Sequence, residues 1–142
     1  MVIGAGQGGI ASALALNDRG VAALVVDEAD QVASRWQARY DRLRLNTSRP
    51  NITPAGRPYP KGHAEFPTRE QAVEHIRGHA RDAGLELLLG TRVERLSRGN
   101  GSWTVETGNG EIEVCLRRPP IEPWAVAVAA SGRTRSKRRS AR

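Results

Sequence analysis

A glycine-rich loop close to the N-terminus constrains the fold of this chain more than any other feature. The first three residues are apolar, and they run directly into the spacing Gly4-x-Gly6-x-x-Gly9. Small apolar residues follow over positions 10–16, as expected for a helix, and residues 21–26 form a continuous apolar run typical of a strand buried on both faces. The segment therefore predicts a βαβ unit with two parallel strands and a right-handed crossover.

The spacing of this loop also predicts a ligand. Gly4 permits a tight turn, Gly6 lets a pyrophosphate approach the backbone, and Gly9 allows the helix and strand to pack closely. The phosphates would lie on the helix N-terminus, where unpaired N–H groups attract anions. Asp27, at the end of the second strand, can accept hydrogen bonds from ribose hydroxyls and disfavours a 2′-phosphate, which argues against NADP at this site. Asp27 rather than Glu28 is expected to face the ribose, because Asp27 directly follows the apolar run.

The rest of the chain predicts an α/β fold with a second, antiparallel sheet. Residues 29–67 contain five prolines, so we expect an ordered loop with a short helix around residues 31–40. A Thr-x-x-Gln capping box at residues 68–71 predicts an amphipathic helix, which Gly84 ends, and residues 85–89 read as another buried strand. Residues 91–98 read as a strand, and alternating faces in 103–107 and 112–116 indicate two more; Gly-Asn-Gly turns separate the three, which predicts an antiparallel meander.

The length and charge of the chain limit the remaining choices. A chain of 142 residues suits one domain, which we place at residues 1–132. The net charge of +7 comes from a tail: six of the 22 Lys and Arg residues lie in 133–142, leaving 16 basic and 15 acidic residues. We expect this tail to be disordered; nucleic-acid binding through it is an alternative function that the near-neutral body disfavours.

Cysteine content and hydropathy indicate the compartment. Cys115 is the single cysteine, which excludes an internal disulfide and predicts a small buried hydrophobe in a reducing environment. The sequence has no apolar run long enough to span a bilayer, so we expect a soluble, cytoplasmic protein with no membrane association. His75 and His79 lie four residues apart on the predicted helix, but the spacing lacks a metalloprotease carboxylate; we expect an exposed pair and no metal site, and His63 in solvent.

Residues 2–114 resemble the flavin-containing monooxygenases and the related bacterial oxidoreductases, plant auxin-synthesis flavoenzymes and Baeyer–Villiger enzymes. Besides the glycine motif, the likeness rests on Asp27, where the family usually has Glu, and on Trp36 nine residues later. It also rests on the run 40–47, on Phe-Pro-Thr at 66–68 and on Gly-Ser-Trp-x-Val at 101–105. The resemblance implies a Rossmann-like FAD-binding domain with an antiparallel meander, in agreement with the pattern of strands and helices.

The resemblance also implies the roles of particular residues. The pyrophosphate would lie on Gly4, Ala5, Gly6, Gln7 and Gly9; the ribose on Asp27, with Glu28 beside it; the adenosine half beside Arg35 and Trp36; the flavin near Asn46 and Thr47; and the adenine on the backbone of Val93. Family members reduce the flavin with NADPH and insert one oxygen atom into a substrate. No catalytic residue is assigned, and a plain NAD-binding module, which Asp27 also permits, stays an alternative.

The chain departs from the family pattern at both ends. The first strand is short, and a second glycine motif for NADPH and the returning C-terminal part of the FAD domain are missing from the sequence. Residues 126–132 only loosely match the Ala-Thr-Gly strand that usually follows the meander. We therefore expect the N-terminal part of a flavoenzyme that is incomplete at the C-terminus, either truncated or frameshifted near Cys115, or completed by another chain or a second copy.

Overall fold

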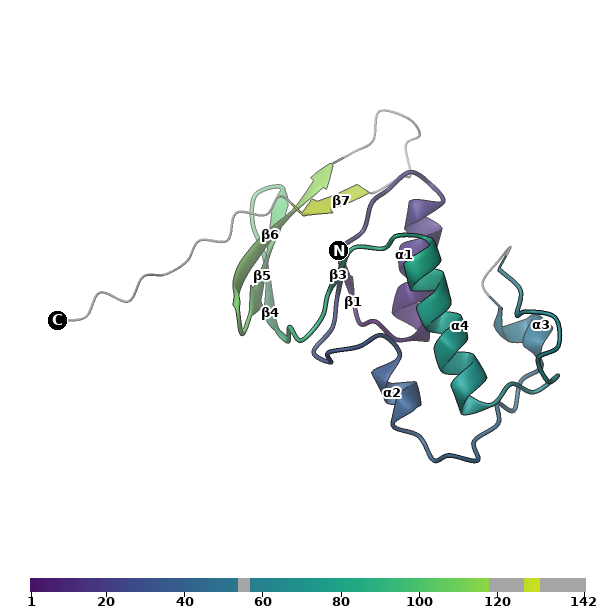
Figure 1. The fold of residues 1–142 in the computed structure, drawn as a ribbon. Coiled ribbons are helices and arrows are strands. Elements are labelled where there is room, and N and C mark those ends of the chain that lie inside the picture. Colours follow the sequence, from purple (N-terminus) through teal and green to yellow (C-terminus); the bar gives the residue numbers. More distant parts are fainter. Residues whose placement is uncertain (54–56, 118–126, 131–142) are drawn as a thin grey trace.

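The computed structural model describes residues 1–53, 57–117 and 127–130, which form two β-sheets and four helices (Figure 1). One sheet is parallel with the strand order β1-β2-β3, and the other is antiparallel with the order β4-β5-β6-β7. Figure 1 shows α1 and α4 side by side next to the parallel sheet, with the antiparallel sheet on the other side of that sheet. The elements are β1 (Val2–Ile3), α1 (Gln7–Asn17), β2 (Val25–Val26), α2 (Ser34–Gln37), α3 (Arg49–Ile52), α4 (Arg69–Asp82), β3 (Leu87–Leu88), β4 (Val93–Arg98), β5 (Ser102–Thr107), β6 (Gly110–Arg117) and β7 (Ala127–Ala130).

The βαβ unit is confirmed, with shorter strands than predicted. Val25 pairs in parallel with Val2 on one side and with Leu87 on the other. The predicted strands at 21–26 and 85–89 each contribute only two residues to the ladder. β1 also contributes two residues, so each of the two parallel ladders pairs two positions. Beyond the strand ends, the N–H of Gly4 still donates to the Val26 carbonyl at 2.7 Å, so the hydrogen bonding reaches the glycine loop.

Close packing of α1 on β1 requires a glycine at the start of the helix. A Cβ built on Gly9 would lie 1.7 Å from the carbonyl oxygen of Gly4, a distance no side chain tolerates. With this approach, α1 buries Ile10, Ala13 and Leu14 in the core that it shares with the sheet and α4. The role predicted for the third glycine of the motif is thus confirmed.

Helix α4 begins and ends as its sequence predicts. The Thr68 side chain accepts from the Gln71 N–H (3.3 Å), and the Gln71 side chain accepts from the Thr68 N–H (3.0 Å), which completes the capping box. Gly84 follows the helix with φ +58°, in the left-handed region that favours glycine. The apolar face of α4, which includes Val73 and Ile76, packs in the same core as α1.

The segment between β2 and α4 is irregular, as the prolines indicate, but the predicted helix at 31–40 is confined to α2. Ala33 has φ +61°, and a residue in the left-handed region cannot continue a right-handed helix, so α2 begins only after it. Further along, the Leu45 N–H donates to the Pro67 carbonyl at 2.9 Å, and Arg44 forms a bridge with Thr68. The guanidinium of Arg69 adds contacts to this loop, including an ion pair with Asp41 (2.8 Å).

The antiparallel meander is confirmed and gains a strand. Strands β4, β5 and β6 match the three predicted alternating segments, and β7 pairs with β6 over four positions from Val114↔Ala130 to Arg117↔Ala127. The sequence did not predict β7 as part of this sheet, because its small residues have weak strand propensity and prolines precede them. The predicted disordered tail at 133–142, and the environment of the Cys115 side chain, lie outside what the structure describes.

Candidate dinucleotide site

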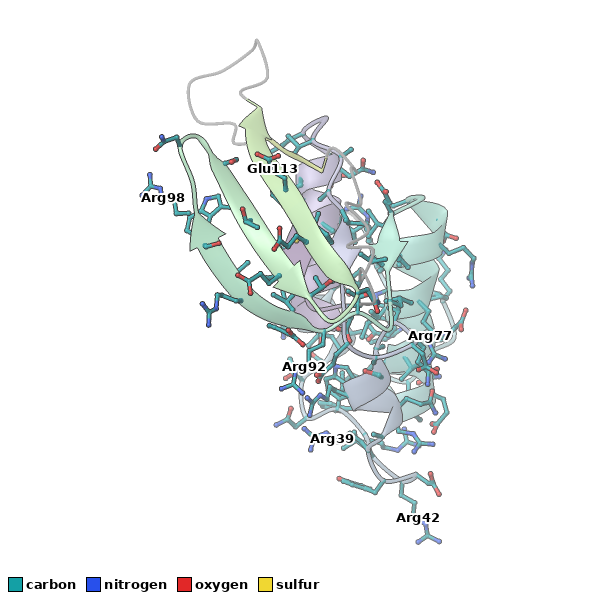
Figure 2. The ribbon with its side chains drawn as sticks, turned by 90° about the vertical axis from the view of Figure 1, so that its left-hand side faces the viewer. Arg39, Arg42, Arg77, Arg92, Arg98 and Glu113 are labelled. Carbon is teal, nitrogen blue, oxygen red and sulfur yellow. The ribbon has the colours of Figure 1, made fainter. Side chains whose placement is uncertain are left out.

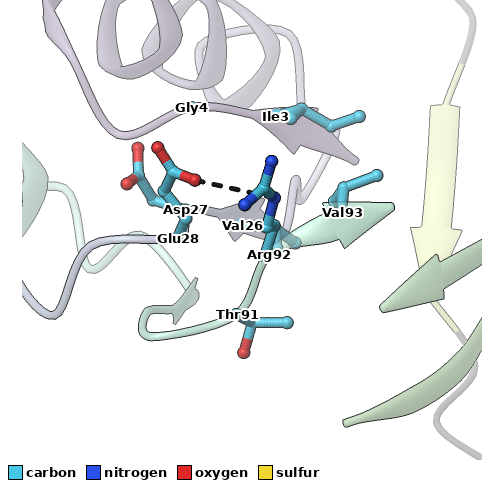
Figure 3. Close-up of a pocket in the computed structure, with 8 residues that line it drawn as sticks. All are labelled: Ile3, Gly4, Val26, Asp27, Glu28, Thr91, Arg92 and Val93. Carbon is cyan, nitrogen blue, oxygen red and sulfur yellow. Dashed lines mark ion pairs between the residues drawn. The ribbon is translucent and has the colours of Figure 1, made fainter. Parts of the chain in front are cut away.

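A pocket of about 320 Å³ lies at the carboxyl ends of β1 and β2, where the chain leaves β3 and enters β4 (Figure 3). In open α/β sheets, ligands bind outside the carboxyl ends of the strands, which is where this pocket lies. It is lined by Ile3, Gly4, Val26, Asp27, Glu28, Thr91, Arg92 and Val93.

The Asp27 carboxylate is fixed between two backbone segments. Oδ2 accepts a hydrogen bond from the Ala5 N–H of the glycine loop at 2.5 Å, and Oδ1 accepts from the Ala29 N–H at 2.8 Å. Each carboxylate oxygen has room for a second hydrogen bond, so both can still accept from a hydroxyl group. The carboxylate is therefore positioned at the glycine loop while it keeps acceptor capacity toward a ligand.

The N-terminus of α1 has the properties of an anion site. The first N–H groups of a helix have no intrahelical partner, and here no side chain caps them and no acidic residue occupies the first turn. A Cβ built on Gly6 meets no atom within 4 Å, so the loop is open at that point. The loop and the helix N-terminus thus fit a pyrophosphate, with Asp27 beside them.

Glu28 lies at the pocket between two arginines. Its Oε1 is 3.2 Å from Arg35 Nη2, and its Oε2 is 3.9 Å from Arg92 Nε. Figure 3 shows the second of these ion pairs reaching across the space between β2 and the start of β4. In Figure 2, Arg92 projects outward near the meander, whose hairpin carries Arg98. Both ion pairs are solvent-exposed, so each contributes only about 0–1 kcal/mol to stability.

The structure brings several of the residues predicted for the site into one place. Gly4, Asp27, Glu28 and Val93 all line the pocket, although β2 and β4 are far apart in the sequence. Ala5 and Arg35 lie next to the pocket: Ala5 is hydrogen-bonded to Asp27, and Arg35 forms an ion pair with Glu28.

Other predicted residues lie outside this pocket. Trp36 packs against the hydrophobic core rather than lining the pocket. The Gln7 side chain donates to the carbonyl of Ile52 in α3 at 3.4 Å, and the Thr47 hydroxyl donates to Asn46 Oδ1 at 3.3 Å. Gly6 and Gly9 belong to the loop and the first turn of α1, outside the pocket walls.

The prediction missed four residues that line the pocket: Ile3, Val26, Thr91 and Arg92. Ile3 and Val26 are the last residues of β1 and β2, so the rule that ligands lie at carboxyl ends of parallel strands could have found them. Thr91 and Arg92 follow β3, and no motif marks them. The Thr91 N–H donates to the Asp27 carbonyl at 2.8 Å, which brings this segment against β2.

The predicted exposed histidine pair is wrong: His75 is 9% exposed, and His79 is half-buried. The His75 ring stacks on Tyr59 with a centroid distance of 3.6 Å, and its Nε2 lies 3.0 Å from His79 Nε2. His63, predicted in solvent, is half-buried beside Tyr59, and its Nδ1 is buried without a hydrogen-bond partner among the described residues. The sequence did not show that the loop carrying Tyr59 covers this face of α4.

Burial lowers the pKa of the His75 imidazole to about 4, with smaller contributions from His79 and His63. Burial also lowers the pKa of His79, with Arg57 adding to the effect. At neutral pH the two rings are therefore uncharged and can share a hydrogen bond. Within the described part of the chain, no group of three or more His, Cys, Asp or Glu side chains could hold a metal ion.

Comparison with known families decides what kind of protein carries this site. Residues 1–114 match the family model described as pyridine nucleotide-disulphide oxidoreductase, across the parallel sheet, the pocket and most of the meander. The chain belongs to this family. The family assignment confirms the resemblance to FAD- and NAD(P)-dependent oxidoreductases expected from the sequence.

Curated relatives align with most of the same segment. The chain is 34% identical over 110 residues to the probable indole-3-pyruvate monooxygenase YUCCA9 of Arabidopsis thaliana, covering 75% of this chain and 26% of the relative. It is 33% identical over 115 residues to the indole-3-pyruvate monooxygenase YUCCA1 of Oryza sativa subsp. japonica, covering 79% of this chain and 28% of the relative. The chain thus spans about a quarter of the length of these relatives.

Solved structures of other proteins share the fold. A bacillithiol disulfide reductase from Staphylococcus aureus superposes with a TM-score of 0.72 at 19% identity, over 78% of this chain and 34% of that one. A flavin-containing monooxygenase from Stenotrophomonas maltophilia superposes with a TM-score of 0.70 at 24% identity, over 77% of this chain and 33% of that one. The Rossmann-like α/β fold with a meander is therefore confirmed. No described helix is both long and apolar enough to cross a membrane.

Proposed function

We propose that this chain is the FAD-binding N-terminal portion of a flavin-dependent, monooxygenase-like oxidoreductase. The observation that carries the proposal is the Asp27 carboxylate, bound to the Ala5 N–H of the glycine loop and lining a pocket at the carboxyl ends of the parallel strands. The relatives named as indole-3-pyruvate monooxygenases, which align over this part of the chain, support a flavoenzyme of oxygenating type.

In this proposal the residues bind the two halves of the cofactor from different elements. The loop residues Gly4, Ala5, Gly6, Gln7 and Gly9 hold the pyrophosphate at the N-terminus of α1. Asp27 accepts hydrogen bonds from the adenosine ribose, and the Val93 backbone contacts the adenine. Arg35 and Trp36 would lie beside the adenosine half, and Asn46 and Thr47 near the flavin.

The chemistry itself would belong to the cofactor. When bound, FAD supplies the redox step of an oxygenase, with NADPH as the expected reductant of the intact enzyme. The residues of this chain would bind and orient the dinucleotide. Asp27 would accept hydrogen bonds from the ribose, the α1 N–H groups would donate to the phosphates, and Ile3, Val26 and Val93 would supply apolar contacts.

The decisive experiment is flavin retention by the purified chain. The protein is incubated with FAD, freed of unbound ligand and examined by visible absorption. Asp27→Asn removes the negative charge with little change in size, and Asp30→Asn, at an exposed position outside the pocket, makes the same charge change as a control. We expect a retained flavin band in the wild type and the control, and its loss in Asp27→Asn.

A folded wild-type chain that retains no flavin, or an Asp27→Asn variant that retains as much as the control, would contradict the proposal. Circular dichroism on each variant verifies that the fold is intact. Displacement of FAD is then attempted with excess NAD⁺, because a plain NAD-binding module would prefer NAD⁺. Deleting residues 133–142 should leave FAD retention unchanged, since the proposed contacts all lie between residues 4 and 93.

A further inference from the structure

We propose that Glu28 is a specificity residue that keeps ligands with a 2′-phosphate on the adenosine out of the pocket. It would do so by neutralising two arginines, Arg35 and Arg92, that could otherwise bind that phosphate. The inference rests on the proposed function, because it concerns the ribose end of the same dinucleotide site.

The geometry places one carboxylate between two guanidinium groups from different elements. Arg35 belongs to α2 and approaches Oε1 of Glu28 at 3.2 Å, whereas Arg92 precedes β4 and lies 3.9 Å from Oε2. Figure 3 shows Arg92 and Glu28 facing each other over the pocket. Among the described residues, Glu28 is the only carboxylate that pairs with either arginine.

Both arginines could turn toward a ligand if Glu28 lost its charge. Their side chains are 87% and 77% exposed, so packing does not hold them in place. Guanidinium groups bind phosphate in a bidentate manner, and an arginine near the adenosine ribose is the device by which dinucleotide folds accept a 2′-phosphate. Arg92 lines the pocket, and Arg35 lies beside it through its ion pair with Glu28, so two donors for such a phosphate are paired with this one carboxylate.

The neighbouring carboxylate cannot replace Glu28 in this role. Asp27 is committed to the backbone, since its two oxygens accept from the N–H groups of Ala5 and Ala29. It lies at the proposed ribose position, whereas Glu28 pairs with the arginines. In the wild type, a 2′-phosphate would meet two carboxylates and two paired guanidinium groups; with Glu28 neutral, it would meet one carboxylate and two free guanidinium groups.

The test compares two adenosine probes, 5′-AMP and adenosine 2′,5′-bisphosphate, by isothermal titration calorimetry on the purified chain. In Glu28→Gln we expect the affinity for the 2′,5′-bisphosphate to rise about tenfold relative to 5′-AMP, a gain that increasing salt reduces. Glu106→Gln is the matched control: it makes the same charge change and releases Arg95 from an ion pair of 4.0 Å on the meander, away from the pocket.

A second variant links the gain to the arginines. Adding Arg35→Met and Arg92→Met to Glu28→Gln should abolish the preference for the 2′-phosphate. If Glu28→Gln gains no more than Glu106→Gln, or if the gain survives loss of both arginines, the inference is overturned. These outcomes are separable from failure of the proposed function, which would appear as a wild-type chain that binds neither FAD nor 5′-AMP.

Discussion

The N–H of Ala5 donates to Oδ2 of Asp27 at 2.5 Å, which joins the glycine loop to the end of β2. The two residues are 22 positions apart, and the second carboxylate oxygen accepts from Ala29 on the other side. Asp27 thus holds the loop in shape in addition to facing the pocket. A single side chain couples the structure of the glycine loop to the wall of the pocket.

Replacing Asp27 with Ala should lower the free energy of unfolding by about 2–4 kcal/mol, because two part-buried N–H groups lose a charged acceptor. Urea denaturation followed by circular dichroism measures this loss. Asp30→Ala, at an exposed position next to the same turn, should change the unfolding free energy by less than about 0.5 kcal/mol. Equal effects for the two variants would mean that the Ala5 and Ala29 hydrogen bonds contribute nothing.

Two adjacent glycines at the start of α1 should respond to alanine in opposite directions. Gly9→Ala places a Cβ 1.7 Å from the Gly4 carbonyl oxygen, so α1 must move away from β1, at a cost we expect to exceed about 3 kcal/mol. Gly8→Ala meets nothing within 4 Å and should stabilise the helix by about 0.5–1 kcal/mol. Thermal and urea unfolding of both variants measure the difference. A Gly9→Ala variant as stable as the wild type would contradict the close approach.

Stability should fall as the pH drops from about 6.5 toward 4. In the folded protein the pKa of His75 is about 4, below its ordinary value of 6.5, so folding favours the neutral ring. The contribution of His75 to the free energy of unfolding is therefore complete above pH 6.5. Below that value the unfolded chain takes up a proton that the folded chain resists, which costs about 1–2 kcal/mol after allowing for partial solvation. The lowered pKa of His79 acts in the same direction.

Urea denaturation at several pH values measures how steeply the free energy of unfolding changes with pH. His75→Phe keeps an aromatic ring against Tyr59 but cannot titrate, so the slope between pH 6.5 and 4 should be smaller in this variant. An unchanged slope in His75→Phe would assign the pH dependence to other groups.

A valine at position 33 should destabilise the protein. Ala33 combines φ +61° with 1% exposure, and a β-branched side chain is strained in the left-handed region and has no space in the core. We expect Ala33→Val to cost about 2 kcal/mol or more in unfolding free energy. Ala38→Val, at an exposed position with φ −78°, is the control and should change it by less than about 0.5 kcal/mol. Comparable losses in both would show that the backbone conformation of Ala33 is not a constraint.

Local sequence patterns were sufficient for the elements that depend on near neighbours. The glycine spacing predicted the β1–α1 turn, and the Thr68–Gln71 capping box predicted the start of α4. Asp27 could be placed at the pocket, because the end of a buried strand after a glycine loop has a known position in a βαβ unit. In these cases the physical cause, a steric limit or a hydrogen bond within a few residues, is contained in the sequence itself.

The sequence by itself determined the βαβ start, the meander and the carboxylate that faces the pocket, whereas the tertiary structure decided which distant groups complete them. Thr91 and Arg92 reach the pocket because β3 pairs with β2, and His75 is buried because Tyr59 stacks on it. Strand β7 joins the meander in the same way, through pairing with β6. Such contacts depend on how the whole chain packs, and no local pattern of residue types specifies them.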